Sequence, residues 1–142
     1  MAQDALKHSR LLEELATYFQ GEGFKILSAR GLPEFSPPEP IHNDGYGDQQ
    51  EKVPDLVALD EVNGHCVLGV VRTGDGDFES EGALTEYNVY LDQTDRYYKK
   101  PYRVYLIAPS ERIHELNALI THYIHREYWH KVIFVSSKEY EK

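Results

Sequence analysis

The chain has 142 residues, with 24 Asp or Glu against 15 Lys or Arg, so its formal net charge at pH 7 is -9. This length is typical of one domain, and hydrophobic and charged fractions of 41% and 27% exclude a wholly disordered chain and a collagen-like repeat. No apolar run is long enough to span a membrane, and the N-terminal residues lack the apolar core of a signal peptide. We therefore expect a single cytoplasmic domain over residues 1–142, without membrane association.

The first elements are a helix and a short strand. Residues 3–20 have the spacing of an amphipathic helix, because Leu12, Leu15 and Phe19 recur three or four residues apart. A strand is expected at 24–28. Regular structure is then expected to stop, because residues 31–52 hold four prolines and three glycines. This stretch is either a functional flap, a mobile surface loop or an insertion.

Two strands with a tight turn between them come next. The apolar runs at 53–60 and 65–72 predict the strands, and Asn63-Gly64 between them is the strongest short-range signal for a hairpin. The second strand is almost entirely apolar, which predicts a central strand buried on both faces. Cys66 lies within it and is expected to be an inert, packed thiol.

The rest of the chain alternates between helix and strand. The patterns predict a helix over 83–100, a strand over 102–108, a helix over 111–126 with Ser110 as its N-cap, and a strand over 131–135. The resulting order is α-β-β-β-α-β-α-β. This order predicts an α/β fold with a mixed sheet of about five strands and helices on both faces.

This order of elements resembles the PD-(D/E)XK nuclease superfamily. The resemblance depends on Pro54-Asp55 at the start of the second strand and on Val70-Val71-Arg72-Thr73-Gly74 at the end of the third. Gly21-Glu22-Gly23-Phe24 after the first helix is also similar to archaeal resolvase-type members. The resemblance covers roughly Leu6 to Val135 and implies a restriction-endonuclease-like core.

The resemblance also implies a site. Members of the superfamily hold Mg²⁺ or Mn²⁺ between two acids, and a lysine two residues after the second acid stabilises charge on the phosphate. Asp55 matches the first acid, but Val70 stands where the second acid should be and Arg72 stands where the lysine should be. Valine offers no metal ligand, and arginine keeps its proton. The implied protein is a catalytically impaired member, a pseudoenzyme that acts as a nucleic-acid-associated or partner-binding module.

One alternative is an active nuclease with a displaced second acid. Asp75 could join Asp55 as a metal ligand, or Glu86 could act with Asp55 and Arg72 as a catalytic residue. Glu86 and Tyr90 lie four residues apart on one helix face and could point into such a site together. Solvated acidic side chains would explain both acids equally well.

A second group of residues suggests surface contacts. Tyr90, Arg96, Tyr97, Lys99 and Lys100 interleave aromatic and cationic side chains, as single-stranded DNA or RNA requires and as protein hot spots also show. Ordinary packing of the tyrosines is the third possibility. The charge of -9 disfavours tight non-specific nucleic-acid binding. A purely protein-binding scaffold, with a protein partner or a second copy of the chain, therefore remains a further alternative.

Overall fold

The computed structural model describes residues 2–43 and 45–138. Its helices and strands are, in chain order, α1 (Ala2–Gly21), β1 (Lys25–Ala29), β2 (Leu56–Asp60), β3 (His65–Val71), α2 (Glu81–Asp92), β4 (Arg103–Pro109), α3 (Ile113–Tyr123) and β5 (Val132–Ser137). Two short 3-10 helices, Ser110–Arg112 and Arg126–Lys131, flank α3. None of the helices in this described part combines the length and the hydropathy that a membrane crossing needs.

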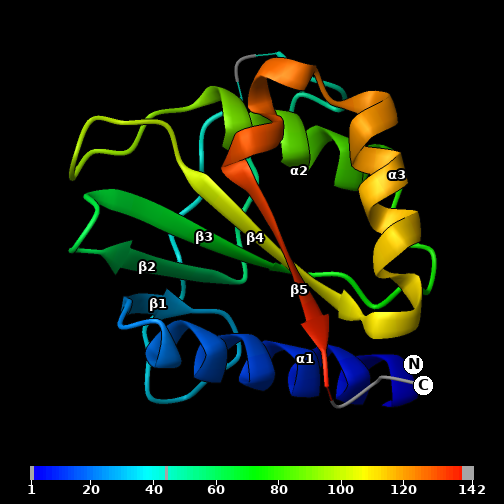
Figure 1. Cartoon of the computed structure of the whole chain (residues 1–142), viewed down its shortest axis with the longest axis horizontal. Coiled ribbons are helices and arrows are strands. Elements are labelled where there is room, and N and C mark those ends of the chain that lie inside the picture. Colours follow the sequence, from blue (N-terminus) through cyan, green and yellow to red (C-terminus); the bar gives the residue numbers. More distant parts are fainter. Residues whose placement is uncertain (1, 44, 139–142) are drawn as a thin grey trace.

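The strands form one open sheet in the order β1-β2-β3-β4-β5 (Figure 1). The pairs β1-β2 and β2-β3 are antiparallel, whereas β3-β4 and β4-β5 are parallel. Parallel neighbours need a crossover connection, and α2 and α3 provide the two crossovers. The predicted α/β class, with a mixed sheet of five strands flanked by helices, is confirmed.

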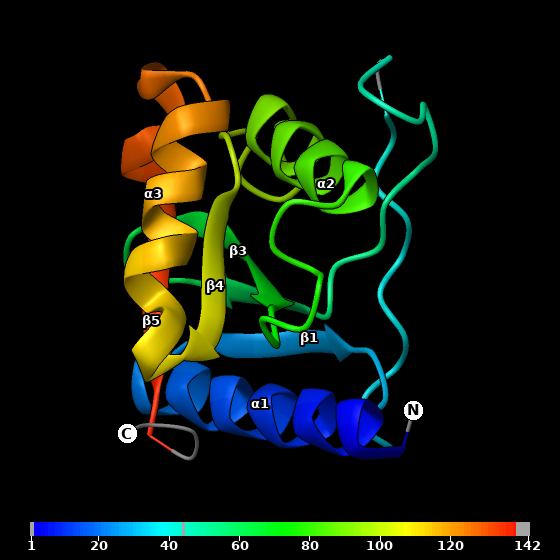
Figure 2. The ribbon, with the colours of Figure 1, turned by 90° about the vertical axis from the view of Figure 1, so that its right-hand side faces the viewer.

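The helices cover both faces of the sheet. Figure 2 shows α1 along one side and α2 and α3 on the other. On the α1 side, Leu15 and Phe19 belong to a buried cluster with residues of the central strands. A Cβ atom on Gly69 would lie 2.9 Å from Leu15 Cδ2, so this glycine in β3 allows α1 to approach closely. On the opposite face, Leu68 and Leu106 join the cluster under α2 and α3.

The predicted hairpin is confirmed. Asp60 pairs with His65 across the β2-β3 ladder, and Gly64 has a φ of +71° in the turn. The Asp60 carboxylate accepts hydrogen bonds from the Asn63 backbone N–H at 3.1 Å and from Asn63 Nδ2 at 2.9 Å. As expected for a central strand, β3 is buried along nearly its whole length.

The helix predicted over 83–100 is wrong at its C-terminal end, because α2 stops at Asp92. A different arrangement of hydrogen bonds follows the helix, which ends with an extended Gln93. One carboxylate oxygen of Asp95 accepts from the N–H groups of Tyr97 and Tyr98, at 2.8 and 2.6 Å. Aspartate commonly favours such a turn over a helix in this way.

Two other boundaries also differ from the prediction. Ser110 begins a 3-10 turn instead of capping α3, whose N-cap is Arg112. Arg112 Nη1 donates to the Gly74 carbonyl at 3.1 Å, which ties this turn to the loop after β3. At the other end of the core, β2 begins at Leu56, later than predicted, and Pro54 just before it has no N–H to donate to a ladder.

The Pro- and Gly-rich stretch at 31–52 passes beside α2 (Figure 2). Ile41 and Lys52 form an isolated antiparallel bridge within it. The buried Asn43 side chain donates to the carbonyls of Tyr46 and Gln50, at 2.9 Å each. A Cβ atom on Gly47 would overlap Thr85 of α2, so the loop lies tightly against that helix.

Candidate functional site at the start of β2 and the end of β3

Asp55 is a buried carboxylate, with only 7% of the residue exposed. It lies just before β2, where its backbone N–H donates to the Gly69 carbonyl of β3 at 3.0 Å. Its Oδ2 accepts a hydrogen bond from the Val71 N–H at 2.8 Å, and its Oδ1 lies 3.4 Å from His8 Nε2. Both carboxylate oxygens therefore have protein partners.

His8 is a member of this site that the sequence prediction missed. It comes from α1, and its pKa is raised above the usual value chiefly by the hydrogen bond to Asp55, while burial acts in the opposite direction. A signal for it exists in the sequence, because His8, Leu12 and Leu15 follow the i, i+4, i+7 spacing of the buried face. A polar residue on that stripe points toward the sheet, where His8 meets Asp55.

Arg72 follows the last residue of β3 and is 5% exposed. Its Nε donates to the Tyr87 hydroxyl at 2.8 Å, its Nη1 to the Val71 carbonyl at 3.2 Å, and its Nη2 to Glu86 Oε2 at 3.1 Å. The guanidinium carbon also lies 5.0 Å from the centroid of the Tyr87 ring. The side chain is thus held on several sides by α2 and by its own strand.

Glu86 of α2 joins Arg72 to Tyr90. Its Oε1 accepts from the Tyr90 hydroxyl at 3.0 Å, and the Tyr87 hydroxyl donates to the Phe78 carbonyl at 3.0 Å. The structure therefore brings together Arg72, Glu86 and Tyr90, as the four-residue spacing on α2 suggests. Tyr90, however, is completely buried, so its predicted role as a surface contact for nucleic acid or a partner is wrong. Burial and the Glu86 charge raise its pKa.

Val70 stands where the resemblance predicts a second acid. It is fully buried and belongs to the apolar cluster under α2 and α3, together with Leu68 and Leu106. A carboxylate at this position would lose its hydration without gaining a partner among these aliphatic side chains. Val70 is therefore a residue of the hydrophobic core.

The acids of the loop after β3 have other partners. Asp75 Oδ2 lies 3.3 Å from Lys7 Nζ, and the Asp75 side chain is 45% exposed. Asp77 accepts from the N–H groups of Thr73 and Gly74, at 2.7 and 2.9 Å. Within residues 2–43 and 45–138, no group of three or more His, Cys, Asp or Glu side chains could hold a metal ion.

A cavity of about 450 Å³ opens beside the His8–Asp55 pair. Arg30 and Glu13 contribute charged groups to its lining, and Leu32 contributes apolar surface. Arg30 is also tied to the site through its backbone, because its N–H donates to the Asp55 carbonyl at 2.8 Å. A small polar or anionic group could reach Asp55 and His8 through this cavity.

The remaining predicted contact residues lie in the turn between α2 and β4. Arg96, Tyr97, Lys99 and Lys100 are all exposed there, as a surface role requires. The Cys66 thiol, in contrast, is buried, and burial raises its pKa to about 12. The thiol is thus not a nucleophile at neutral pH.

Comparison of the chain with protein-family models, with curated proteins and with solved structures found no match.

Proposed function

We propose that the chain is a divergent member of the PD-(D/E)XK superfamily that has lost its metal-dependent catalytic centre and acts as a nucleic-acid-associated or partner-binding module. The observation that carries this proposal is the set of contacts around Asp55. The carboxylate that would bind the metal has one oxygen on the Val71 N–H and the other beside His8. Each carboxylate oxygen thus has a protein contact that would compete with a bound Mg²⁺.

The two other family positions support the same proposal. Val70 supplies no oxygen, and the Arg72 guanidinium is directed into α2, where Glu86 and Tyr87 bind it. An arginine that stabilised a phosphate would instead present its donors to the substrate. The Asp55 carboxylate instead has the His8 imidazole beside it, with Nε2 at 3.4 Å.

An active nuclease would need a displaced acid to complete the metal site. Glu86 is the better candidate, because it lies 3.1 Å from Arg72. Both of its oxygens, however, already accept hydrogen bonds from the protein. A metal would have to displace Arg72 or Tyr90 from it, which makes the impaired form the simpler proposal.

The test is a nuclease assay with Mg²⁺ or Mn²⁺ on plasmid, single-stranded and branched DNA and on RNA. The proteins are the wild type, Asp55→Asn and the matched control Asp92→Asn, which removes an exposed carboxylate at the end of α2. We expect no metal-dependent cleavage by any of them. Cleavage by the wild type and by Asp92→Asn that disappears in Asp55→Asn would refute the proposal.

The binding part of the proposal is tested separately. Fluorescence anisotropy with labelled DNA and RNA oligonucleotides is measured over a range of salt concentrations. Affinity that falls steeply with salt indicates phosphate contacts, whereas an apolar protein interface is insensitive to salt. If no oligonucleotide binds, the protein-binding scaffold is the alternative that remains.

A further inference from the structure

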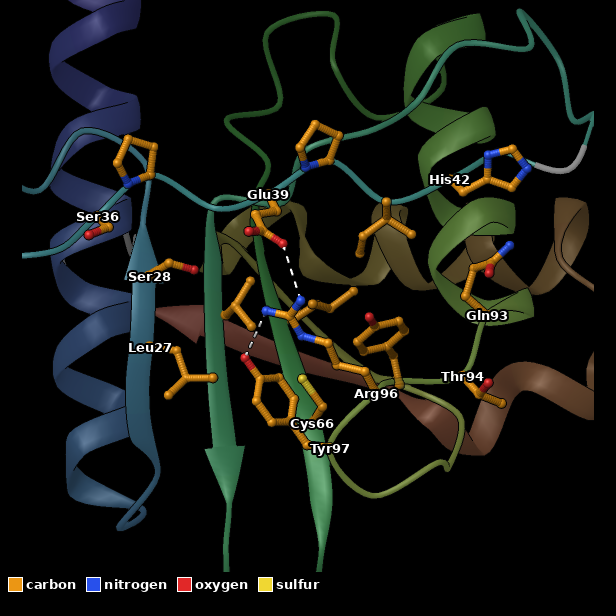
Figure 3. Close-up of a pocket in the computed structure, with 16 residues that line it drawn as sticks. Leu27, Ser28, Ser36, Glu39, His42, Cys66, Gln93, Thr94, Arg96 and Tyr97 are labelled. Atoms are coloured by element: carbon orange, nitrogen blue, oxygen red, sulfur yellow. Dashed lines mark hydrogen bonds and ion pairs between the residues drawn. The ribbon is translucent and has the colours of Figure 1, made fainter.

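A second cavity, away from Asp55, lies over the sheet where no helix covers it. Its volume is about 430 Å³, within the range of small-molecule sites, and its floor includes Val57, Cys66 and Leu68 from β2 and β3. Its roof is the segment 36–42, which we call the strap. Figure 3 shows the strap passing above the strands, with Glu39 directed down toward the cavity.

The strap is attached to the fold at both ends. The Ser36 carbonyl accepts from the Ala29 N–H of β1 at 3.0 Å. At the other end, Ile41 exchanges two backbone hydrogen bonds with Lys52, at 2.7 and 3.1 Å. The space under the strap is therefore bounded by hydrogen-bonded backbone on both sides.

The mouth of the cavity holds a guanidinium group with a replaceable partner. Arg96 Nη1 lies 3.5 Å from Glu39 Oε2, and the two side chains are 71% and 77% exposed. Arg96 Nη2 donates to the Tyr97 hydroxyl at 3.3 Å. Figure 3 shows the guanidinium between these two partners. Such exposed ion pairs contribute little to stability, so another carboxylate can take the place of Glu39 at low cost.

We propose that this cavity binds a small planar aromatic molecule that carries one carboxylate group. The ring would lie on the apolar floor, and the carboxylate would replace Glu39 on Arg96. Glu39 of the strap already places a carboxylate beside Arg96, which indicates that the carboxylate of a ligand fits there. A guanidinium suits a carboxylate because its parallel N–H groups bind both oxygens.

Among the residues that line the cavity, Arg96 carries a positive charge and Glu39 a negative one, so displacement of Glu39 leaves the guanidinium to an incoming carboxylate. The Cys66 thiol in the floor stays protonated because burial raises its pKa to about 12, so binding is non-covalent. This inference concerns a different site from the proposed function and does not depend on it.

The experiment titrates the full chain with 2-naphthoate and follows the ligand fluorescence. We expect a Kd on the order of 1 mM or lower. Arg96→Ala should weaken binding by about fivefold, as loss of an exposed ion pair does. Glu39→Gln should strengthen binding by about twofold, because it removes the competing carboxylate. Lys100→Ala, which removes an exposed charge in the same turn but outside the cavity, should change the Kd less than either.

Two readouts decide the outcome. Naphthalene-2-carboxamide, which lacks the charge, should bind the wild type and Arg96→Ala equally. Methyl NMR signals of Val57 and Leu68 should shift on addition of 2-naphthoate. The proposal is overturned if 2-naphthoate does not bind, if Arg96→Ala and Lys100→Ala weaken binding equally, or if the shifted methyl groups lie elsewhere in the protein.

Discussion

Replacement of Arg72 by methionine tests whether the guanidinium belongs to the core or to a substrate site. Methionine keeps the apolar stem but removes three hydrogen bonds, to Tyr87, to the Val71 carbonyl and to Glu86. Removal of one partner from a buried ion pair costs about 3–5 kcal/mol. The Glu86 side chain is 22% exposed and regains some hydration, so we expect the lower end, about 3 kcal/mol.

A double-mutant cycle with Glu86→Gln isolates the charge pair. Glutamine keeps an oxygen for the Tyr90 hydroxyl but removes the negative charge that Arg72→Met would leave unpaired. The double variant should therefore be more stable than Arg72→Met alone by about 1–2 kcal/mol. Urea unfolding followed by far-UV circular dichroism measures all four proteins. A cost below about 1 kcal/mol for Arg72→Met, or strictly additive effects, would refute the closed ion-pair network.

Three shorter predictions concern the core and the Asp55 contact. Because the folded pKa of His8 is raised, its pairing with Asp55 contributes its full stability below the ordinary histidine pKa of 6.5, and this contribution is lost as pH rises through the folded pKa. Unfolding of His8→Gln from pH 5 to 9 should show a smaller pH dependence than the wild type, and an unchanged dependence would contradict the contact. Gly69→Ala, which crowds α1, should destabilise by about 1–3 kcal/mol. Gly82→Ala on α2, where open space surrounds the glycine, should instead stabilise the protein by about 0.5–1 kcal/mol. Urea unfolding measures both variants, and equal changes in the free energy of unfolding would refute the close approach of α1 to Gly69. The Cys66 thiol should react with a thiol reagent at pH 8 only after unfolding, whereas rapid reaction of the native protein would contradict its burial.

The elements that local signals define could be predicted from the sequence. Asn63-Gly64 indicates a hairpin because its backbone tolerates positive φ, and the apolar run of β3 requires burial on both faces. The end of α2 could not be predicted from periodicity. Apolar spacing continues past Asp92, but the Asp95 side chain accepts from two backbone N–H groups in the turn that replaces the predicted last turns of the helix. Such competition depends on side-chain geometry, which a pattern of hydrophobic residues does not contain.

In the site, too, a contact between residues close in the sequence could be predicted, whereas burial by distant parts of the chain could not. Glu86 and Tyr90 share a helix face, so their contact follows from a spacing of four residues. Tyr90 is nevertheless buried, because the cluster beneath α2 includes side chains from distant parts of the chain. Burial of one helix face depends on what packs against it, and the sequence of the helix alone does not specify that.

The contact with His8 changes the interpretation of Asp55, and a search of the sequence for acidic residues alone does not find it. A buried carboxylate needs a positive charge or hydrogen-bond donors around it. In a metal-dependent nuclease the ion supplies that charge, whereas the Asp55 carboxylate has a histidine of α1 and one backbone N–H as its partners. An acid at Val70 would in addition lie among aliphatic side chains that offer it no partner. We therefore expect that Val70→Glu alone would not create a metal site and that His8 would also have to be replaced; titration of both variants with Mn²⁺ by isothermal calorimetry measures this, and binding by Val70→Glu alone would contradict it.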